Sequence, residues 1–299
     1  TTAVRPEHRF DTNNLKRYLS AKLDNFSGTI TVQQYRAGQS NPTFYIEAAD
    51  KRYVLRKKPP GQLLPGAHKI DREYAVQKSL HSVGFPVPCP VLYCADTGVI
   101  GTEFYIMEHV QVCTICSYFL SLSIQRSNKD AHLMPFFTWE AESDAFSLGL
   151  LGYGKGAGYC KRQVSTWTKQ YKASAHKEIP AMGKLSDWLS NNLPVSDYEV
   201  SLVHGDFRID NLIFHPTEAR VLALLDWELS TTGHPIADLA YFLMPHYWPS
   251  HHKVISTMRI PSPDDLCSIY CSCRGIPKSL PQQNFFVAMA IFKMAAIAQ

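Results

Sequence analysis

The 299-residue sequence lacks long hydrophobic runs, a strong charge imbalance and a regular spacing of cysteines. No stretch reaches the roughly 18 apolar residues that a membrane span needs, so we expect no transmembrane segment. Lys and Arg number 30 against 26 Asp and Glu, a net charge of +4, which is too small for a dedicated nucleic-acid-binding protein. The eight cysteines are scattered, which disfavours a secreted disulfide framework.

Apolar residues, by contrast, are abundant. Hydrophobic residues make up 45% of the chain and aromatic residues 12%, so a sizeable core is expected, in about two domains or lobes. The first residue is not Met, and the polar stretch from Thr1 to Arg9 is unlike a signal peptide. The chain stops inside the apolar run 285–298, which no Gly or Pro terminates. We therefore expect a fragment of a longer protein.

The first part of the chain, residues 1–110, reads as a small β-rich lobe. Alternating runs at 29–35, 43–47 and 52–56 predict three antiparallel strands. A helix is predicted over 70–83, with Asp71 and Glu73 in its first turn. Two further strand-like runs follow at 91–93 and 103–108. This order of elements indicates an α+β lobe.

Residues 111–299 have more helical patterning and read as a larger second lobe. Helices are predicted near 161–176 and 181–192, and from 264 to the end of the chain. Two short β runs, 200–203 and 221–225, each end in a group of polar residues. The fold class predicted for the whole chain is therefore α+β with two lobes.

The polar groups after these two β runs have the spacing of a phosphoryl-transfer site. His204, Asp206 and Asn211 follow the first run, and Asp226 follows the second. Phosphoryl transfer needs a carboxylate that orients and deprotonates an attacking hydroxyl, and oxygen ligands for Mg²⁺. Arg208 is placed to supply a cation near the transferring group. The alternative is a polar turn between two hairpin strands without chemical function.

The stretch HGDFRIDN, followed by LLDWE, resembles the aminoglycoside phosphotransferase-like kinases, which share the two-lobed protein-kinase fold. The runs YRAGQSNPTFY, GFPVPCPVLYCAD and LDWELSTTGHPIADLAYF are similar to the N-terminal kinase domains of acyl-CoA dehydrogenase family proteins. That similarity covers roughly residues 8–111 and 150–299. It implies an ATP- and Mg²⁺-dependent kinase that phosphorylates the hydroxyl of 4-hydroxyacyl-CoA.

The resemblance also implies partners and a compartment. A C-terminal acyl-CoA dehydrogenase domain, absent from this chain, would carry the phosphorylated product toward fatty-acid β-oxidation, and FAD would bind only in that domain. The expected compartment is the peroxisome or the mitochondrion.

For the catalytic loop, the resemblance assigns Asp206 as catalytic base and Asn211 and Asp226 as Mg²⁺ ligands. His204 would hold the turn, and Asp238 would brace it from a helix N-terminus.

For the nucleotide, the resemblance points to residues of the first lobe. Arg56 occupies the place of the strand lysine that contacts nucleotide phosphates, and a guanidinium binds phosphate bidentately. Glu73 would pair with Arg56 from the following helix, although an Arg on a strand and a Glu on a helix are more often merely solvated. The remaining expected nucleotide contacts are backbone groups of a loop and a hinge: Gly38, Gln39, Ser40, Asn41, Glu108 and Val110.

Residues 112–147 depart from the pattern of these relatives. Met134-Pro135 interrupts the helix expected there. A splice variant, a gene-model error and a genuine insert would all read this way. Two other functions therefore stay open: a catalytically silent, pseudokinase-like module that binds nucleotide or acyl-CoA, and a choline- or aminoglycoside-type phosphotransferase.

Overall fold

The computed structural model describes residues 1–24, 26–36, 41–61, 68–111, 148–150, 152–218, 220–248, 261–277, 280 and 282–298. The chain forms two compact units. The first consists of Thr1–Gln111 and Ala223–Glu228, and the second of Val112–Leu222 and Leu229–Gln299. A division at residue 110 alone would therefore assign Ala223–Glu228 to the second part, whereas these residues pack with the first.

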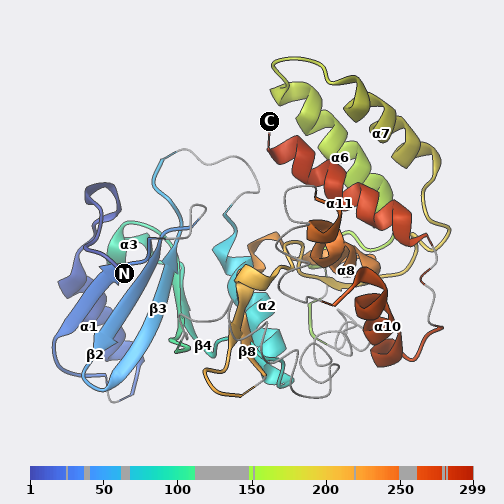
Figure 1. Ribbon diagram of the computed structural model, residues 1–299. Coiled ribbons are helices and arrows are strands. Elements are labelled where there is room, and N and C mark those ends of the chain that lie inside the picture. Colours follow the sequence, from blue (N-terminus) through green and yellow to red (C-terminus); the bar gives the residue numbers. More distant parts are fainter. Residues whose placement is uncertain are drawn as a thin grey trace. The chain divides into compact units, whose positions relative to one another are not determined.

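The first unit is built on a five-stranded antiparallel sheet (Figure 1). Its strand order is β1-β2-β3-β5-β4, with every adjacent pair antiparallel. Its elements, in chain order, are η1 (Pro6–His8), α1 (Thr12–Lys22), β1 (Ile30–Gln34), β2 (Thr43–Ala48), β3 (Lys51–Lys57), α2 (Ile70–Ser82), β4 (Pro90–Cys94), α3 (Thr97–Ile100) and β5 (Phe104–Glu108).

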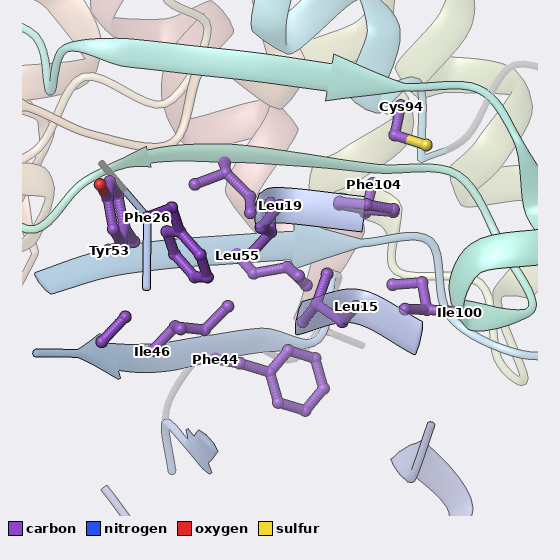
Figure 2. Close-up of a cluster of buried hydrophobic side chains, with 12 residues drawn as sticks. Leu15, Leu19, Phe26, Phe44, Ile46, Tyr53, Leu55, Cys94, Ile100 and Phe104 are labelled. Carbon is purple, nitrogen blue, oxygen red and sulfur yellow. The ribbon is translucent and has the colours of Figure 1, made fainter. Parts of the chain in front are cut away.

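The period-two alternation of the strands separates two cores, one on each face of the sheet. On one face, Leu55 and Phe104 belong to a cluster with Leu15 and Leu19 of α1 (Figure 2). On the other face, Val54 and Tyr105 cluster with Ile70 at the start of α2. Arg56 follows Val54 by two positions, so the same alternation directs its side chain toward α2.

The segment Ala223–Glu228 is tied into the first unit by backbone and aromatic contacts. The Leu224 N–H donates to the Pro86 carbonyl at 2.8 Å. The Trp227 ring meets the Phe85 ring edge-on, with centroids 5.8 Å apart. The Trp227 indole N–H donates to the Leu224 carbonyl at 3.1 Å, which satisfies the polar atom of a buried ring. Asp226 is therefore held at a fixed place in the first unit.

The second unit is mainly helical, with α6, α7 and α11 side by side (Figure 1). A two-stranded sheet, β6–β9, accompanies the helices. The elements after residue 148, in chain order, are α6 (Tyr159–Ser174), α7 (Pro180–Asn191), β6 (Ser201–Val203), η2 (Ile209–Asn211), β7 (Leu212–Phe214), β8 (Val221–Leu224), η3 (Trp227–Leu229), β9 (Thr231–Gly233), α8 (Ile236–Leu243), η4 (Met244–Tyr247), α10 (Pro263–Arg274) and α11 (Gln283–Ile297).

The structure confirms the predicted α+β class and most of the predicted elements, with one correction. The helical segment expected from 264 onward is two helices, because α10 ends at Gly275 in the left-handed conformation (φ 62°). Helices α1 and α3 were not predicted. Residues 112–147 lie outside the described part of the chain. Among the described helices, none has both the length and the apolar character of a bilayer span.

Candidate active site

In the first unit, the candidate residues gather around the guanidinium of Arg56. Its Nη1 lies 2.6 Å from Glu73 Oε1 of α2, so the predicted ion pair is present. Nη1 and Nη2 both donate to Asp226 Oδ1 at 3.0 Å. Glu228 Oε2 lies 3.7 Å from Nη2. One buried cation thus faces three carboxylates.

Burial and charge act against each other in this cluster. Burial disfavours the charged form of Arg56, yet Glu73, Asp226 and Glu228 raise its pKa above the usual value. Burial raises the pKa of Glu73 to about 7, although Arg56 lowers it. Glu73 Oε2 and Arg56 Nε are buried without a hydrogen-bond partner in the described part of the chain. Arg56 therefore keeps its positive charge, while Glu73 changes its protonation state near neutral pH.

Asp226 combines an unusual backbone with a partly open carboxylate. Its φ is 68°, in the left-handed region that few non-glycine residues adopt. Its side chain is 35% exposed, whereas that of Glu73 is fully buried. Strained backbone of this kind is often found where a side chain must be aimed at a ligand.

The one described member of the predicted phosphate loop is Asn41, since Gly38, Gln39 and Ser40 lie outside the described residues. The Asn41 side chain is fully buried. Its Nδ2 donates to Glu228 Oε2 at 2.7 Å, and its Oδ1 lies 2.9 Å from His68 Nδ1. Asn41 therefore links the end of the loop to the Arg56 cluster through Glu228, a contact that sequence reasoning missed.

The predicted hinge follows directly after β5. The Glu108 N–H donates to the Cys89 carbonyl at 2.9 Å, and the His109 N–H to the Arg52 carbonyl at 3.0 Å. For the Val110 N–H, the described residues offer no hydrogen-bond partner. Val110 is therefore the hinge residue with a backbone donor available for a ligand.

In the second unit, the candidate residues occupy the loop after β6. Gly205 has φ 83°, and an added Cβ would lie 2.6 Å from the Leu229 carbonyl oxygen, so only glycine fits. The Asp206 N–H donates to His204 Nδ1 at 3.2 Å. Asn211 Nδ2 donates to the Asp206 backbone carbonyl at 2.9 Å and to Asp206 Oδ2 at 3.1 Å. His204 and Asn211 thus hold the Asp206 backbone, and Asn211 also holds its carboxylate.

Two charged side chains outside the loop fix its backbone. The Asp238 carboxylate accepts hydrogen bonds from the N–H groups of His204 (2.6 Å) and Gly205 (2.9 Å), which is the bracing role predicted for it. Lys293 Nζ donates to the Gly205 carbonyl at 2.6 Å. Burial raises the pKa of Asp238, and the two backbone donors and Lys293 lower it.

Sequence reasoning missed Lys293, although the sequence carries a signal for it. Lys293 is the only charged residue in the helical stretch Gln283–Ile297. A lone charge in such an apolar helix has to find buried partners. Arg208, which was predicted, has a half-exposed side chain, with its Nε 3.7 Å from Asp206 Oδ2 and its Nη2 3.7 Å from Asp210 Oδ2.

The predicted Mg²⁺ ligands have suitable donor chemistry. The described residues contain no group of three His, Cys, Asp or Glu side chains arranged for a metal. Mg²⁺ is usually held by one or two protein carboxylates together with substrate phosphates, so such a group is not required. The Asn211 amide nitrogen is taken up by Asp206, which leaves the amide oxygen for a cation. Asp226 Oδ1 faces Arg56, and the partly exposed carboxylate also carries Oδ2. Both residues therefore fit Mg²⁺.

Comparison with known proteins settles the family. The model of the phosphotransferase enzyme family matches residues 31–114 and 141–253. This chain belongs to that family. The residues left between the two matched stretches, 115–140, lie inside 112–147, where the sequence was expected to depart from its relatives.

Curated relatives confirm the resemblance to acyl-CoA dehydrogenase family proteins. Acyl-CoA dehydrogenase family member 11 of Pongo abelii is 55% identical over 99% of this chain. Member 10 of Mus musculus is 42% identical over 100% of it. The chain spans 40% of the length of the first relative and 29% of the second. It therefore corresponds to one part of longer proteins.

Solved structures confirm the fold. A putative aminoglycoside phosphotransferase from Ralstonia eutropha matches with 36% identity and a TM-score of 0.81, over 97% of this chain and 88% of that one. A thermostable mutant of aminoglycoside phosphotransferase APH(4)-Ia, in complex with AMP-PNP and hygromycin B, matches at 14% identity and a TM-score of 0.61, over 95% and 91% of the two chains. The chain is a small-molecule O-phosphotransferase domain of this fold.

Proposed function

We propose that this chain transfers the γ-phosphoryl group of ATP to the hydroxyl of a 4-hydroxyacyl-CoA. The observation that carries the proposal is the loop after β6, in which Asn211 and His204 hold Asp206 and leave its carboxylate partly exposed. The choice of acceptor is supported by similarity to acyl-CoA dehydrogenase family members, over nearly the whole of this chain. ATP is supported by the family and by the AMP-PNP bound to a protein of the same fold.

In the proposed reaction, Asp206 accepts the proton of the substrate hydroxyl. The hydroxyl oxygen forms a bond to the γ-phosphorus as the bond from that phosphorus to the β–γ bridging oxygen breaks, and ADP leaves. Asp206, held by Asn211, is oriented before the substrate arrives, which lowers the entropic cost of reaction. Arg208 adds positive charge beside Asp206.

The nucleotide phosphates would be bound by Arg56, whose planar guanidinium suits phosphate. The Val110 N–H would meet the adenine. Asn211 and Asp226 would ligate Mg²⁺, which when bound offsets negative charge on the phosphates. We also propose, on similarity alone, that the full-length protein carries a C-terminal dehydrogenase domain that uses the product, and works in the peroxisome or the mitochondrion.

The test is to incubate the purified chain with Mg²⁺, ATP and a 4-hydroxyacyl-CoA and to analyse the CoA esters by mass spectrometry. We expect a gain of one phosphate that depends on ATP and is absent with an acyl-CoA lacking the hydroxyl. ATP binding without any phosphorylated ester would contradict the proposal and favour a silent binding module. Phosphorylation of choline or an aminoglycoside in place of the ester would identify a different acceptor class.

A further inference from the structure

A pocket in the second unit lies beside the loop that carries Asp206. Its cavity volume is about 20 Å³, so the pocket is small while Lys293 fills it. Its walls come from α6, α8 and α11 and from the loop itself, and its lining residues are Tyr159, Gln163, Trp167, Gly205, Ala237, Asp238, Tyr241, Met289, Ala290 and Lys293. The pocket is thus largely aromatic and apolar, with one cation.

That cation lies against the aromatic rings of the pocket. Lys293 Nζ is 4.7 Å from the centroid of the Tyr241 ring and 5.7 Å from that of the Trp167 ring. Both distances are in the range of a cation–π interaction. The hydrogen bond from Nζ to the Gly205 carbonyl, 2.6 Å long, fixes the ammonium at this place.

Without Lys293, these surroundings would suit a cationic ligand. Aromatic rings around a positive charge are the usual means of binding quaternary ammonium groups. Asp206 and Asp238 add negative charge, and both interact with the Lys293 ammonium. Burial lowers the pKa of Lys293 below its usual value, and these two carboxylates oppose that shift. The protein thus supplies from its own helix α11 the cation that such a pocket would attract.

We propose that Lys293 determines the charge class of the acceptor: its ammonium occupies the aromatic faces that a cationic head group would need. Lys293 therefore disfavours cationic alcohols of the choline type and leaves neutral or anionic hydroxyl compounds as the acceptors. The proposal rests on the proposed function, in which Asp206 is the base, and adds that the acceptor approaches Asp206 from the side of this pocket. It distinguishes an acyl acceptor from choline or an aminoglycoside by the chemistry of this chain alone.

The test is to remove the Lys293 ammonium from the aromatic rings by substitution and to measure the binding of choline by titration calorimetry. Lys293→Ala should bind choline about tenfold more tightly or better than the unsubstituted chain, as expected when a desolvated cation–π contact becomes available. Lys293→Arg, which keeps a cation there, should bind choline no better than the unsubstituted chain. Lys169→Ala, which removes an exposed lysine from α6, is the matched control and should behave in the same way. Equal choline affinity in all four chains would overturn the proposal.

A second measurement does not require Lys293→Ala to fold. In the unsubstituted chain, aromatic ring currents should move the NMR signals of the Lys293 ε-methylene protons upfield of those of other lysines. Lys293→Arg assigns these signals by removing them. Unshifted signals would show that the ammonium does not occupy the rings and would overturn the proposal.

The choline titration and the phosphorylation assay are independent. A gain of choline binding in Lys293→Ala, without phosphorylation of 4-hydroxyacyl-CoA by the unsubstituted chain, would support the role of Lys293 and refute the acceptor. Phosphorylation of the ester with no change in choline binding would support the acceptor and refute the role of Lys293.

Discussion

The two units satisfy their buried charges in different ways. In the first unit, Arg56 is compensated by side chains of opposite charge, chiefly Glu73 and Asp226. In the second, Asp238 and Lys293 are compensated largely by the backbone of one loop, through the N–H and C=O groups of Gly205. A cluster of side chains can exchange one partner for another, whereas hydrogen bonds to the backbone fix the position of the chain itself.

This difference suits the two tasks proposed for the units. Because Arg56 is shared by several carboxylates, a phosphate can replace one of them without leaving the guanidinium uncompensated. A general base has to be oriented before reaction, and the loop that carries Asp206 is held at both the N–H and the C=O of Gly205. The following predictions test whether binding and chemistry separate in this way.

The largest effect is expected at Asp206. Asp206→Asn keeps the shape of the side chain but removes the proton acceptor, so turnover should fall by about 10²–10⁴-fold. ATP affinity, measured by calorimetry, should stay the same.

Arg56→Lys should have the opposite pattern: it should weaken ATP binding, because lysine lacks the planar fork, and should change turnover at saturating ATP less than Asp206→Asn does. If both variants lost affinity and turnover together, the proposed separation would be wrong.

The next effect is on stability. Glu73→Ala removes a fully buried partner of Arg56 and should lower the free energy of unfolding by about 1–3 kcal/mol, because a buried hydrogen bond is lost while Asp226 and Glu228 still face the guanidinium. Glu47→Ala is the matched control, because Glu47 of β2 also pairs with an arginine of β3. Its pair with Arg52 is 3.7 Å long and about half exposed, so it should cost at most about 1 kcal/mol. Similar losses in urea unfolding would show that burial of the pair does not matter.

The pair of Arg56 and Glu73 was predicted from the resemblance to the kinase family, because an Arg on a strand and a Glu on a helix do not by themselves indicate a pair. Other contacts were missed for a physical reason. The contact between Asn41 and Glu228 joins residues 187 positions apart. No local pattern encodes such a contact. Asp226 illustrates the same limit, since its motif was recognised but its packing with the first unit was not.

Lys293 shows which features of a buried charge can be predicted from the sequence and which cannot. Its isolation in an apolar helix is visible in the sequence, and it signals a buried charge. The identity of its partner, the Gly205 carbonyl, depends on how α11 packs, which periodicity alone does not specify.

The pH dependence of stability should have opposite signs at His234 and Glu73. Burial lowers the pKa of His234 to about 4 from 6.5, so between these values the unfolded chain binds the proton and stability rises with pH. Burial raises the pKa of Glu73 from 4.5 to about 7, so the folded chain binds the proton there and stability falls as pH rises. The histidine contribution amounts to about 3 kcal/mol.

Urea unfolding at about pH 5 and about pH 7 separates the two contributions. His234→Gln should remove a rise in stability between these conditions, and Glu73→Gln should remove a fall. His234 is fully buried, with Nε2 3.0 Å from Ser196 Oγ, and Nδ1 accepts the Ile236 N–H at 3.2 Å. The bond that Nδ1 accepts needs the neutral ring, because a protonated ring carries a hydrogen on Nδ1. A slope unchanged by either substitution would contradict the assignment of that group.

The smallest effect on stability is expected at Gly275, which can be compared with Gly205 because both have a positive φ. Gly275, after α10, has φ 62° and open space where a Cβ would be added, so Gly275→Ala should cost about 1–2 kcal/mol from the backbone alone. Gly205 has φ 83° but is blocked by the Leu229 carbonyl, so Gly205→Ala should cost more than that. It should also lower turnover, because the blocked Cβ forces the peptide away from Asp238 and Lys293 and moves Asp206. Equal costs for the two substitutions, with turnover intact, would mean that the loop tolerates movement and that its backbone contacts do not orient the base.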